Sequence, residues 1–165
     1  EIQPFAMFDW VQDDILLDWD NHRKQRLLEC LTSCEADVIC LQELQLERDN
    51  KKRLVLPDWI EPMIQQYGYE AFLPSPLALD RIAERNVRVL DLDAAVTCAI
   101  LIRTTTKNNN NNQWIPCKES FQKVAMNSHD STCVSVCLLY HRLDDSCSDD
   151  VDVDPIVVTS IHLDA

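Results

Sequence analysis

The sequence predicts a single domain of mixed α/β class, for three reasons. An amphipathic helix is expected directly before a short apolar run at 37–43. The chain has 165 residues, of which 46% are hydrophobic, so it is long enough to bury one core. Further apolar runs of strand length follow at 69–73, 96–102, 133–140 and 155–161.

The first predicted element is a helix of about three turns. Asp20 or Asn21 can cap its first turn, because their side chains accept hydrogen bonds from free backbone amides. The helix then leads through a short connection into the apolar run. Its apolar positions recur at helical spacing: Leu27, Leu28, Leu31 and Cys34.

The run Asp37-Val38-Ile39-Cys40-Leu41-Gln42-Glu43 is typical of a strand covered on both faces. It places the carboxylate of Glu43 at the C-terminal end of the strand, where ligands collect in open α/β sheets. Gln42 is expected to point to the opposite face and hold structure, since neighbours on a strand alternate. The alternative is that Glu43 only begins a solvated loop that continues to Asn50.

The remaining elements follow in order. A second helix is expected to begin at Asp58 and to end at Gly68, which precedes the strand at 69–73. Residues 77–95 are compatible with a short helix or with an irregular surface segment. After the strand at 96–102, the last two predicted strands should pair as an antiparallel hairpin.

Two low-complexity segments are expected to be loop insertions, near 104–113 and 143–154. The first contains the five consecutive asparagines 108–112. The second contains six aspartates but lacks the alternating aspartate and glycine pattern of a calcium loop. We therefore expect neither segment to contribute to the chemistry.

Composition excludes several classes of function. A net charge of −13 argues against a basic surface for long nucleic acids. The single glycine, Gly68, excludes a glycine-rich phosphate loop.

The eight cysteines form no Cys-x-x-Cys pair, so buried, reduced thiols of an intracellular protein are favoured over zinc or disulfides. No apolar run is long enough to span a bilayer. We expect an intracellular protein, most simply cytoplasmic, with nucleus or organelle as alternatives.

Three motifs in order resemble a known superfamily. The helix that begins near Trp19 and Arg23 leads into a strand that starts with aspartate and ends in Leu-Gln-Glu at Glu43. Residues 97–103 read Thr-Cys-Ala-Ile-Leu-Ile-Arg, and residues 160–163 read Ser-Ile-His-Leu. The chain, over residues 15–165, resembles the N-terminal half of the endonuclease/exonuclease/phosphatase superfamily. It is most similar to the deadenylase, nocturnin and 2′-phosphodiesterase branch.

This resemblance implies a fold and an activity. The fold would be an incomplete two-sheet sandwich flanked by helices, the first half of a four-layer domain. The activity would be metal-dependent hydrolysis of a phosphoric ester, by a phosphodiesterase or nuclease with Mg²⁺ as cofactor and Mn²⁺ as an alternative. Glu43 would be the metal ligand and His162 would contact the scissile phosphate. The implied substrates include an RNA 3′ end and a small nucleotide.

The chain also departs from the superfamily pattern. The asparagine of the opening strand has no counterpart in residues 5–10, Val96-Thr97 replace Asp-Gly, and Ile161 replaces a threonine. The downstream Gly-Asp-x-Asn and Ser-Asp-His segments do not occur in residues 1–165. We therefore expect this piece alone to be inactive or nearly so. The alternative function is a degenerate, non-catalytic module that binds a protein or a nucleotide, and His162 would then be a strand-end histidine bonded to nearby backbone.

Overall fold

The computed structural model describes residues 18–104, 112–116, 131–142 and 156–163. For 112–116, 131–142 and 162–163 the description is limited to the backbone. The chain divides into two compact units, Glu1–Glu35 and Ala36–Ala165, which are described separately.

The described part of the first unit is helical. A turn of π-helix, η3 (Trp19–Arg23), continues into α1 (Lys24–Ser33). The cap is Asp18, two residues before the predicted Asp20, because its carboxylate accepts hydrogen bonds from the Asn21 backbone amide (3.0 Å) and side-chain amide (2.9 Å). These bonds, led by the one from the backbone amide, lower the pKa of Asp18. The predicted helix is confirmed and the predicted cap is wrong.

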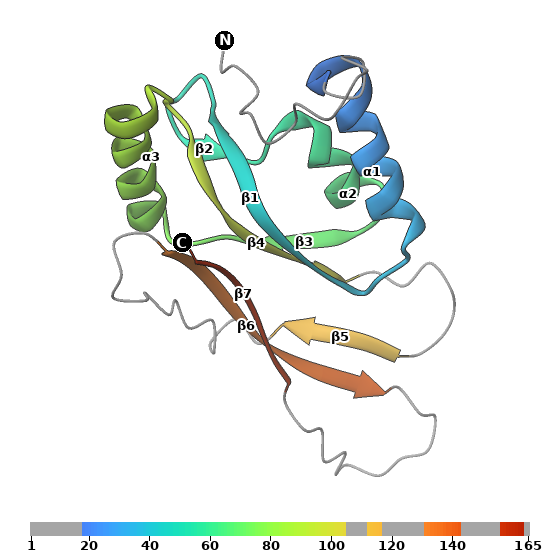
Figure 1. Ribbon diagram of the computed structural model, residues 1–165. Helices are drawn as coiled ribbons and strands as arrows, with labels where there is room; N and C mark the ends of the chain where they lie inside the picture. The colour runs from blue at the N-terminus through green and yellow to red at the C-terminus, as the bar shows by residue number, and fades with distance from the viewer. Residues whose placement is uncertain (1–17, 105–111, 117–130, 143–155, 164–165) are drawn as a thin grey trace. The chain divides into compact units, whose positions relative to one another are not determined.

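The second unit contains two antiparallel sheets and short helices (Figure 1). The four-stranded sheet has the order β2-β1-β4-β3, and the three-stranded sheet has the order β5-β6-β7. The fold class is therefore mixed α/β, as predicted, and all described strand pairs are antiparallel. The elements are β1 (Val38–Arg48), β2 (Leu54–Val55), η4 (Asp58–Ile60), α2 (Glu61–Gln65), β3 (Tyr69–Phe72), α3 (Pro76–Leu90), β4 (Ala95–Arg103), β5 (Asn112–Pro116), β6 (Ser131–Arg142) and β7 (Ile156–Leu163).

One face of the four-stranded sheet is covered by helices. Figure 1 shows α2 and α3 on the side of this sheet that is opposite to β5, β6 and β7. Leu79 and Ala83, four residues apart on α3, are buried, because residues at this spacing share one helix face. The buried residues of β1 and β4 on the helix side alternate along the strands: Ile39, Leu44, Leu46, Ala95, Thr97, Ala99 and Leu101.

The opposite face of the same sheet contacts the three-stranded sheet. Phe72 of β3 and the residues Cys98, Ile100 and Ile102 of β4 form a buried cluster. Val158 of β7 packs against this cluster from the second sheet. The core of the second unit therefore continues from the helices through the first sheet to the second.

Segment 77–95, for which the sequence allowed a helix or an irregular surface segment, is mostly helix. Ser75 caps α3 by accepting a hydrogen bond from the Ala78 amide (3.2 Å), and Pro76 occupies the first turn, where a missing amide hydrogen is tolerated. The helix ends at Asp91, which has a left-handed conformation with φ of 53°. Within the described residues, no helix is long and apolar enough to cross a membrane.

The structure confirms the predicted hairpin and differs from one of the two predicted loops. Strands β6 and β7 pair antiparallel, which confirms the predicted hairpin. Asn112 and Gln113, which were expected in a loop, begin strand β5 and pair with β6. The rest of the asparagine segment after Thr104 and all of 143–154 lie outside the described residues.

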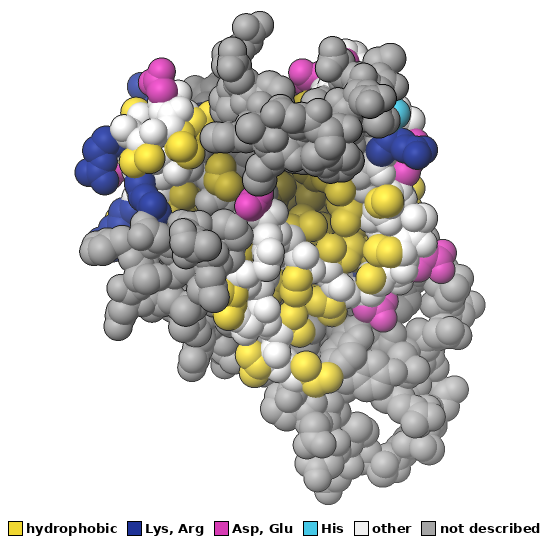
Figure 2. Space-filling model, viewed as in Figure 1, with side chains coloured by type: hydrophobic (Ala, Val, Ile, Leu, Met, Phe, Trp, Pro, Cys, Tyr) yellow, Lys and Arg dark blue, Asp and Glu magenta, His cyan; other side chains and the backbone are white. Residues whose placement is uncertain are grey.

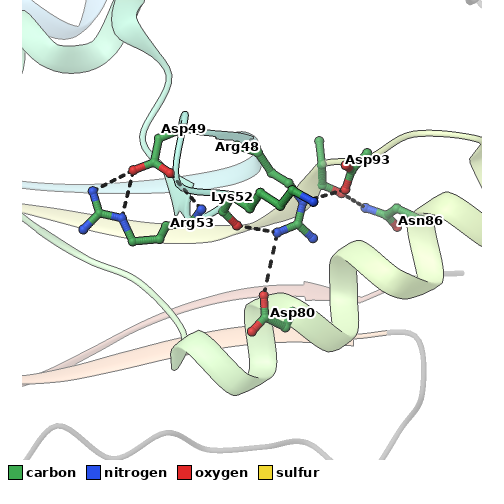
Figure 3. Close-up of polar contacts among 8 residues, drawn as sticks. Arg48, Asp49, Lys52, Arg53, Asp80, Asn86 and Asp93 are labelled. Atoms are coloured by element: carbon green, nitrogen blue, oxygen red, sulfur yellow. Dashed lines mark hydrogen bonds and ion pairs between the residues drawn. The ribbon is translucent and has the colours of Figure 1, made fainter.

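Arg48 joins the end of β1 to α3 and to the segment before β4 (Figure 3). Its guanidinium donates to Asp93 (2.6 Å) and to the Lys52 carbonyl (2.8 Å), and it lies 4.0 Å from Asp80 of α3. Strands β1 and β2 form an antiparallel hairpin, and Asp49 closes its turn, because the Asp49 carboxylate accepts hydrogen bonds from the side chain and the backbone amide of Arg53. These contacts fix the far end of the strand that carries Glu43.

The Asp49–Arg53 pair predicts a pH effect. The Arg53 side chain, followed by the Arg53 backbone amide, lowers the pKa of Asp49. Because the folded-state pKa is depressed, the pair stabilises the hairpin above the unfolded-state pKa, and this is lost as the pH falls through the folded-state value, below about pH 4. Arg53→Met should raise the pKa of Asp49 toward its usual value. An NMR pH titration measures this, and an unchanged pKa would contradict the assigned cause.

Thr97 has a buried hydroxyl whose oxygen has no hydrogen-bond partner among the described residues. Because a buried unpaired polar group costs about 1–3 kcal/mol, Thr97→Val should raise the free energy of unfolding by about 1 kcal/mol. Thr104→Val is the matched control: the Thr104 hydroxyl donates to the Gly68 carbonyl (3.3 Å), so this change should be neutral or destabilising. Urea denaturation measures both, and a destabilised Thr97→Val would show that the hydroxyl has a partner.

Candidate functional site

Glu43 lies in the middle of β1, where the strand bulges. The prediction that Glu43 ends the strand is wrong, since β1 continues to Arg48. Leu41 pairs with Ala99 and Leu44 pairs with Thr97, so two residues, Gln42 and Glu43, lie opposite Cys98 alone. This two-against-one pairing is a β-bulge, a feature that is over-represented next to active sites.

The bulge has an energetic cost and a structural consequence. Glu43 has a φ of 55°, in the left-handed region, which costs a residue other than glycine about 1–2 kcal/mol. The extra residue keeps Leu44 and Leu46 on the buried, helix-covered face while Gln42 and Glu43 are both exposed. The bulge interrupts the period of two on which the predicted alternation of these two side chains was based.

Two hydrogen bonds connect the bulge to the second sheet. The Gln42 side-chain amide donates to the Ile161 carbonyl of β7. The buried hydroxyl of Ser160 donates to the Leu41 carbonyl (3.0 Å). The predicted structural role of Gln42 is therefore confirmed, and residues 119 positions apart in the sequence meet at the bulge.

His162 follows directly after this contact. Its backbone lies within β7 and pairs with Thr132 of β6, and its side chain lies outside the described part of the chain. The structure therefore brings the backbone of the His162 motif to the strand that carries Glu43. Trp19 and Arg23, the other motif residues, contact each other within the first unit, with the guanidinium 5.8 Å from the ring centre.

The donors at the bulge match magnesium only partly. Mg²⁺ keeps several waters and takes one or two carboxylates plus substrate oxygens. Glu43 supplies one exposed carboxylate of this kind. In the part of the chain that the structure describes, no three His, Cys, Asp or Glu side chains are grouped to hold a metal ion. The residues present therefore fit a weak, water-rich site.

Two described cysteines near the bulge are not in a disulfide. Cys98, opposite the bulge, is buried, and Cys40 on β1 is exposed. Although Cys40 is exposed as a whole residue, the surrounding atoms partly desolvate its thiol, and this effect, followed by the neighbouring Cys98, raises the pKa of the Cys40 thiol, which disfavours a reactive thiolate at neutral pH. Cys30 and Cys34 are exposed as well, so of the described cysteines only Cys98 follows the prediction of a buried thiol.

Comparison with known proteins gives no assignment. No protein-family model matches the chain, and no solved structure matches it at a significant level.

Proposed function

We propose that this chain is part of a metal-dependent phosphoric ester hydrolase, of the phosphodiesterase or nuclease type. Glu43 would hold Mg²⁺ or Mn²⁺, and His162 would contact the phosphate. The sequence motifs that suggest these roles are 119 residues apart. Two hydrogen bonds connect their strands, one from the Gln42 side chain to the backbone of β7 and one from the Ser160 hydroxyl to the backbone of β1. That junction is the observation that carries the proposal.

The geometry of the bulge supports a role in binding rather than in packing. A strained backbone persists only where its surroundings hold it, and such strain is concentrated at functional sites. Here the residue with the strained backbone, Glu43, has an exposed carboxylate. The parts of β1 before and after it both pair with β4. The hydrogen bond from the Gln42 side chain to the Ile161 carbonyl fixes the backbone next to Glu43. The Glu43 carboxylate is therefore attached to a rigid part of the strand.

The chemistry suits these residue types. A bound Mg²⁺ would supply Lewis-acid stabilisation of the phosphate charge. Glu43 would anchor the ion, and His162 would donate a hydrogen bond to a non-bridging oxygen. The net charge of −13 favours a short phosphoric ester, such as a nucleotide or an RNA 3′ end, over a long nucleic acid.

Paramagnetic broadening by Mn²⁺ tests the metal site in this chain. We expect weak binding that broadens the backbone amide signals of Gln42–Leu44 and also those of Ser160 and Ile161 across the contact. Glu43→Gln should abolish this broadening. Glu47→Gln, the same change at another exposed position of β1, should leave it intact. Broadening that is centred elsewhere, or that survives Glu43→Gln, would show that Glu43 is not the ligand.

Hydrolysis tests the activity in a chain that also carries the Gly-Asp-x-Asn and Ser-Asp-His segments. Glu43→Gln should reduce Mg²⁺-dependent cleavage of a phosphodiester more than about 100-fold, because even residues behind the ligands contribute 10–100-fold. Retained activity would contradict the metal assignment. Metal binding without turnover would instead support the alternative, a non-catalytic binding module.

A further inference from the structure

The outer face of helix α3 carries a row of arginines. Arg81, Arg85 and Arg88 lie four and three residues apart, so they share one helix face over about 10 Å. This face is opposite to the one that buries Leu79 and Ala83. Figure 2 shows Lys and Arg side chains gathered at the left of the view, over the helix that Figure 1 labels α3. The three arginines form a local basic surface on an acidic chain, and we call it the arginine face.

Two charges of the arginine face are not neutralised within the described part of the chain. Arg81 and Arg88 are exposed, and neither forms an ion pair with a described residue. Arg85, which lies between them, has an interaction of its own, so only Arg81 and Arg88 are counted as available charges.

The acidic side chains of α3 serve Arg48 instead of the arginine face. Asp80 lies 4.0 Å from the Arg48 guanidinium (Figure 3). The pKa of Arg48 is raised first by its hydrogen bond to Asp93, and the charges of the helix residues Asp80 and Glu84 raise it further. Glu84 precedes Arg88 by four residues, a spacing that allows an ion pair, yet residues 18–104 show no such pair. The helix therefore separates its charges, with the acidic groups near Arg48 and the basic groups on the outer face.

The helix itself accounts for only one of the two available charges. Arg88 lies in the last turn of α3, where a cation is stabilised by the free carbonyl groups of the helix end. Arg81 lies in the second turn, where the helix dipole gives a cation no stabilisation. The position of Arg81 is therefore not explained by the stability of α3.

Exposed apolar side chains border the arginine face. Leu77 is 63% exposed and Val89 is 62% exposed. Leu77 precedes Arg81 by four residues and Val89 follows Arg85 by four residues, so each lies beside an arginine on the helix surface. Arginine is enriched in protein interfaces and is frequent among the residues that contribute most to binding. The arginine face therefore offers both ion pairs and apolar contacts.

The size and charge of the arginine face favour an acidic protein segment as its ligand. Guanidinium groups bind carboxylates in a bidentate arrangement, and carboxylates on a helix can repeat at the same spacing as the arginines. At physiological ionic strength, charges on the surface act over about 8 Å, so a ligand of the size of the face senses mainly the arginines. A membrane or a long nucleic acid extends beyond the face, where the acidic remainder of the chain repels it.

A reversible partner suits the arginine face better than a permanent layer of the same domain. Such a layer would remove Arg81 and Arg88 from water, and charged side chains are almost never fully buried unless they are paired. An interface between separate proteins has a polar, solvent-accessible rim, where such charges stay hydrated.

We propose that the arginine face of α3 binds an acidic helical segment of another protein. Carboxylates two turns apart on that segment pair with Arg81 and Arg88, and apolar side chains beside them contact Leu77 and Val89. This inference uses no residue of the candidate metal site and does not depend on the proposed hydrolase activity.

A designed peptide tests the proposal. The probe is a fluorescein-labelled helical peptide with glutamates at positions i, i+4 and i+7 and leucines beside them, and the comparison peptide has glutamines at these three positions. In fluorescence anisotropy, the glutamate peptide should bind at least about tenfold more tightly than the glutamine peptide. The double variant Arg81→Gln with Arg88→Gln should weaken binding of the glutamate peptide at least about tenfold, because it removes two charge-assisted hydrogen-bonding groups.

Matched variants separate the arginine face from the overall charge. Lys51→Gln with Arg26→Gln removes two positive charges from exposed positions outside α3 and should leave binding unchanged. Leu77→Ala leaves the charge unchanged and should weaken binding at least about threefold, because an apolar contact is lost. Equal losses in the two double variants, no loss in Leu77→Ala, or equal binding of the two peptides would overturn the proposal.

Three further measurements identify other occupants. Phosphatidylserine vesicles and an adenine oligoribonucleotide should bind more weakly than the glutamate peptide and should not displace it. If either displaces the peptide from the arginine face, the occupant is a membrane or a nucleic acid, and the proposal is wrong. The glutamate peptide should also bind a longer chain that carries the downstream segments of the domain. Loss of binding in that chain would overturn the proposal, because the domain itself would then cover the face.

Discussion

Replacing Leu46 with alanine is expected to lower the free energy of unfolding by about 2–5 kcal/mol. Leu46 is fully buried on the helix-covered face of β1, opposite Ala95 of β4. The loss has two parts: the transfer free energy of the removed methyl groups and the cavity that a packed core cannot fill. The bulge accommodates the extra residue Glu43 while Leu44 and Leu46 stay on the inner face.

Leu77→Ala is the control for this prediction. It removes the same atoms from a leucine that is 63% exposed at the start of α3, so its effect should stay within about 0.5 kcal/mol. Urea denaturation of both variants gives the difference in free energy of unfolding. Similar losses in the two variants would mean that Leu46 is not part of the core.

Deleting Glu43 is expected to leave the fold intact and to abolish metal binding. The deletion leaves Gln42 alone opposite Cys98 and joins the two registers of β1 into one regular ladder with β4. It also removes the left-handed residue, which costs about 1–2 kcal/mol, so the free energy of unfolding should be unchanged or higher. Thermal unfolding followed by circular dichroism measures stability, and Mn²⁺ broadening measures binding.

Two further variants separate the bulge from the carboxylate. Glu43→Gly keeps the bulge with a residue that adopts positive φ without strain, so it should be more stable than the wild type and should not bind metal. Deleting Gln42 keeps the carboxylate but removes the bulge and the tie to Ile161, so it should bind metal more weakly. If deletion of Glu43 unfolded the protein, the bulge would be a structural requirement instead of a binding feature.

Local patterns predicted most of the elements. The spacing of Leu27, Leu28 and Leu31 predicted α1. Runs rich in apolar and β-branched residues predicted β4, β6 and β7, and the short run with Tyr69 and Phe72 predicted β3. The charged residues of segment 77–95 are compatible both with a helix and with an irregular surface segment. In the structure most of the segment is helical, and Leu79 and Ala83 are buried on one face of that helix. The Asp18 cap was missed because Asp18, Asp20 and Asn21 are all suitable caps.

The candidate site divides in the same way. The sequence by itself determined which residues have suitable chemistry, because carboxylate and imidazole groups can be recognised from residue type and motif. Only the tertiary structure decided that Glu43 lies at a bulge within a longer strand and that β7 meets that strand through Gln42 and Ser160. A bulge depends on the register with β4, and the contact with β7 joins residues 119 positions apart. Neither is a local property of the chain, so no pattern of neighbouring residues could have specified them.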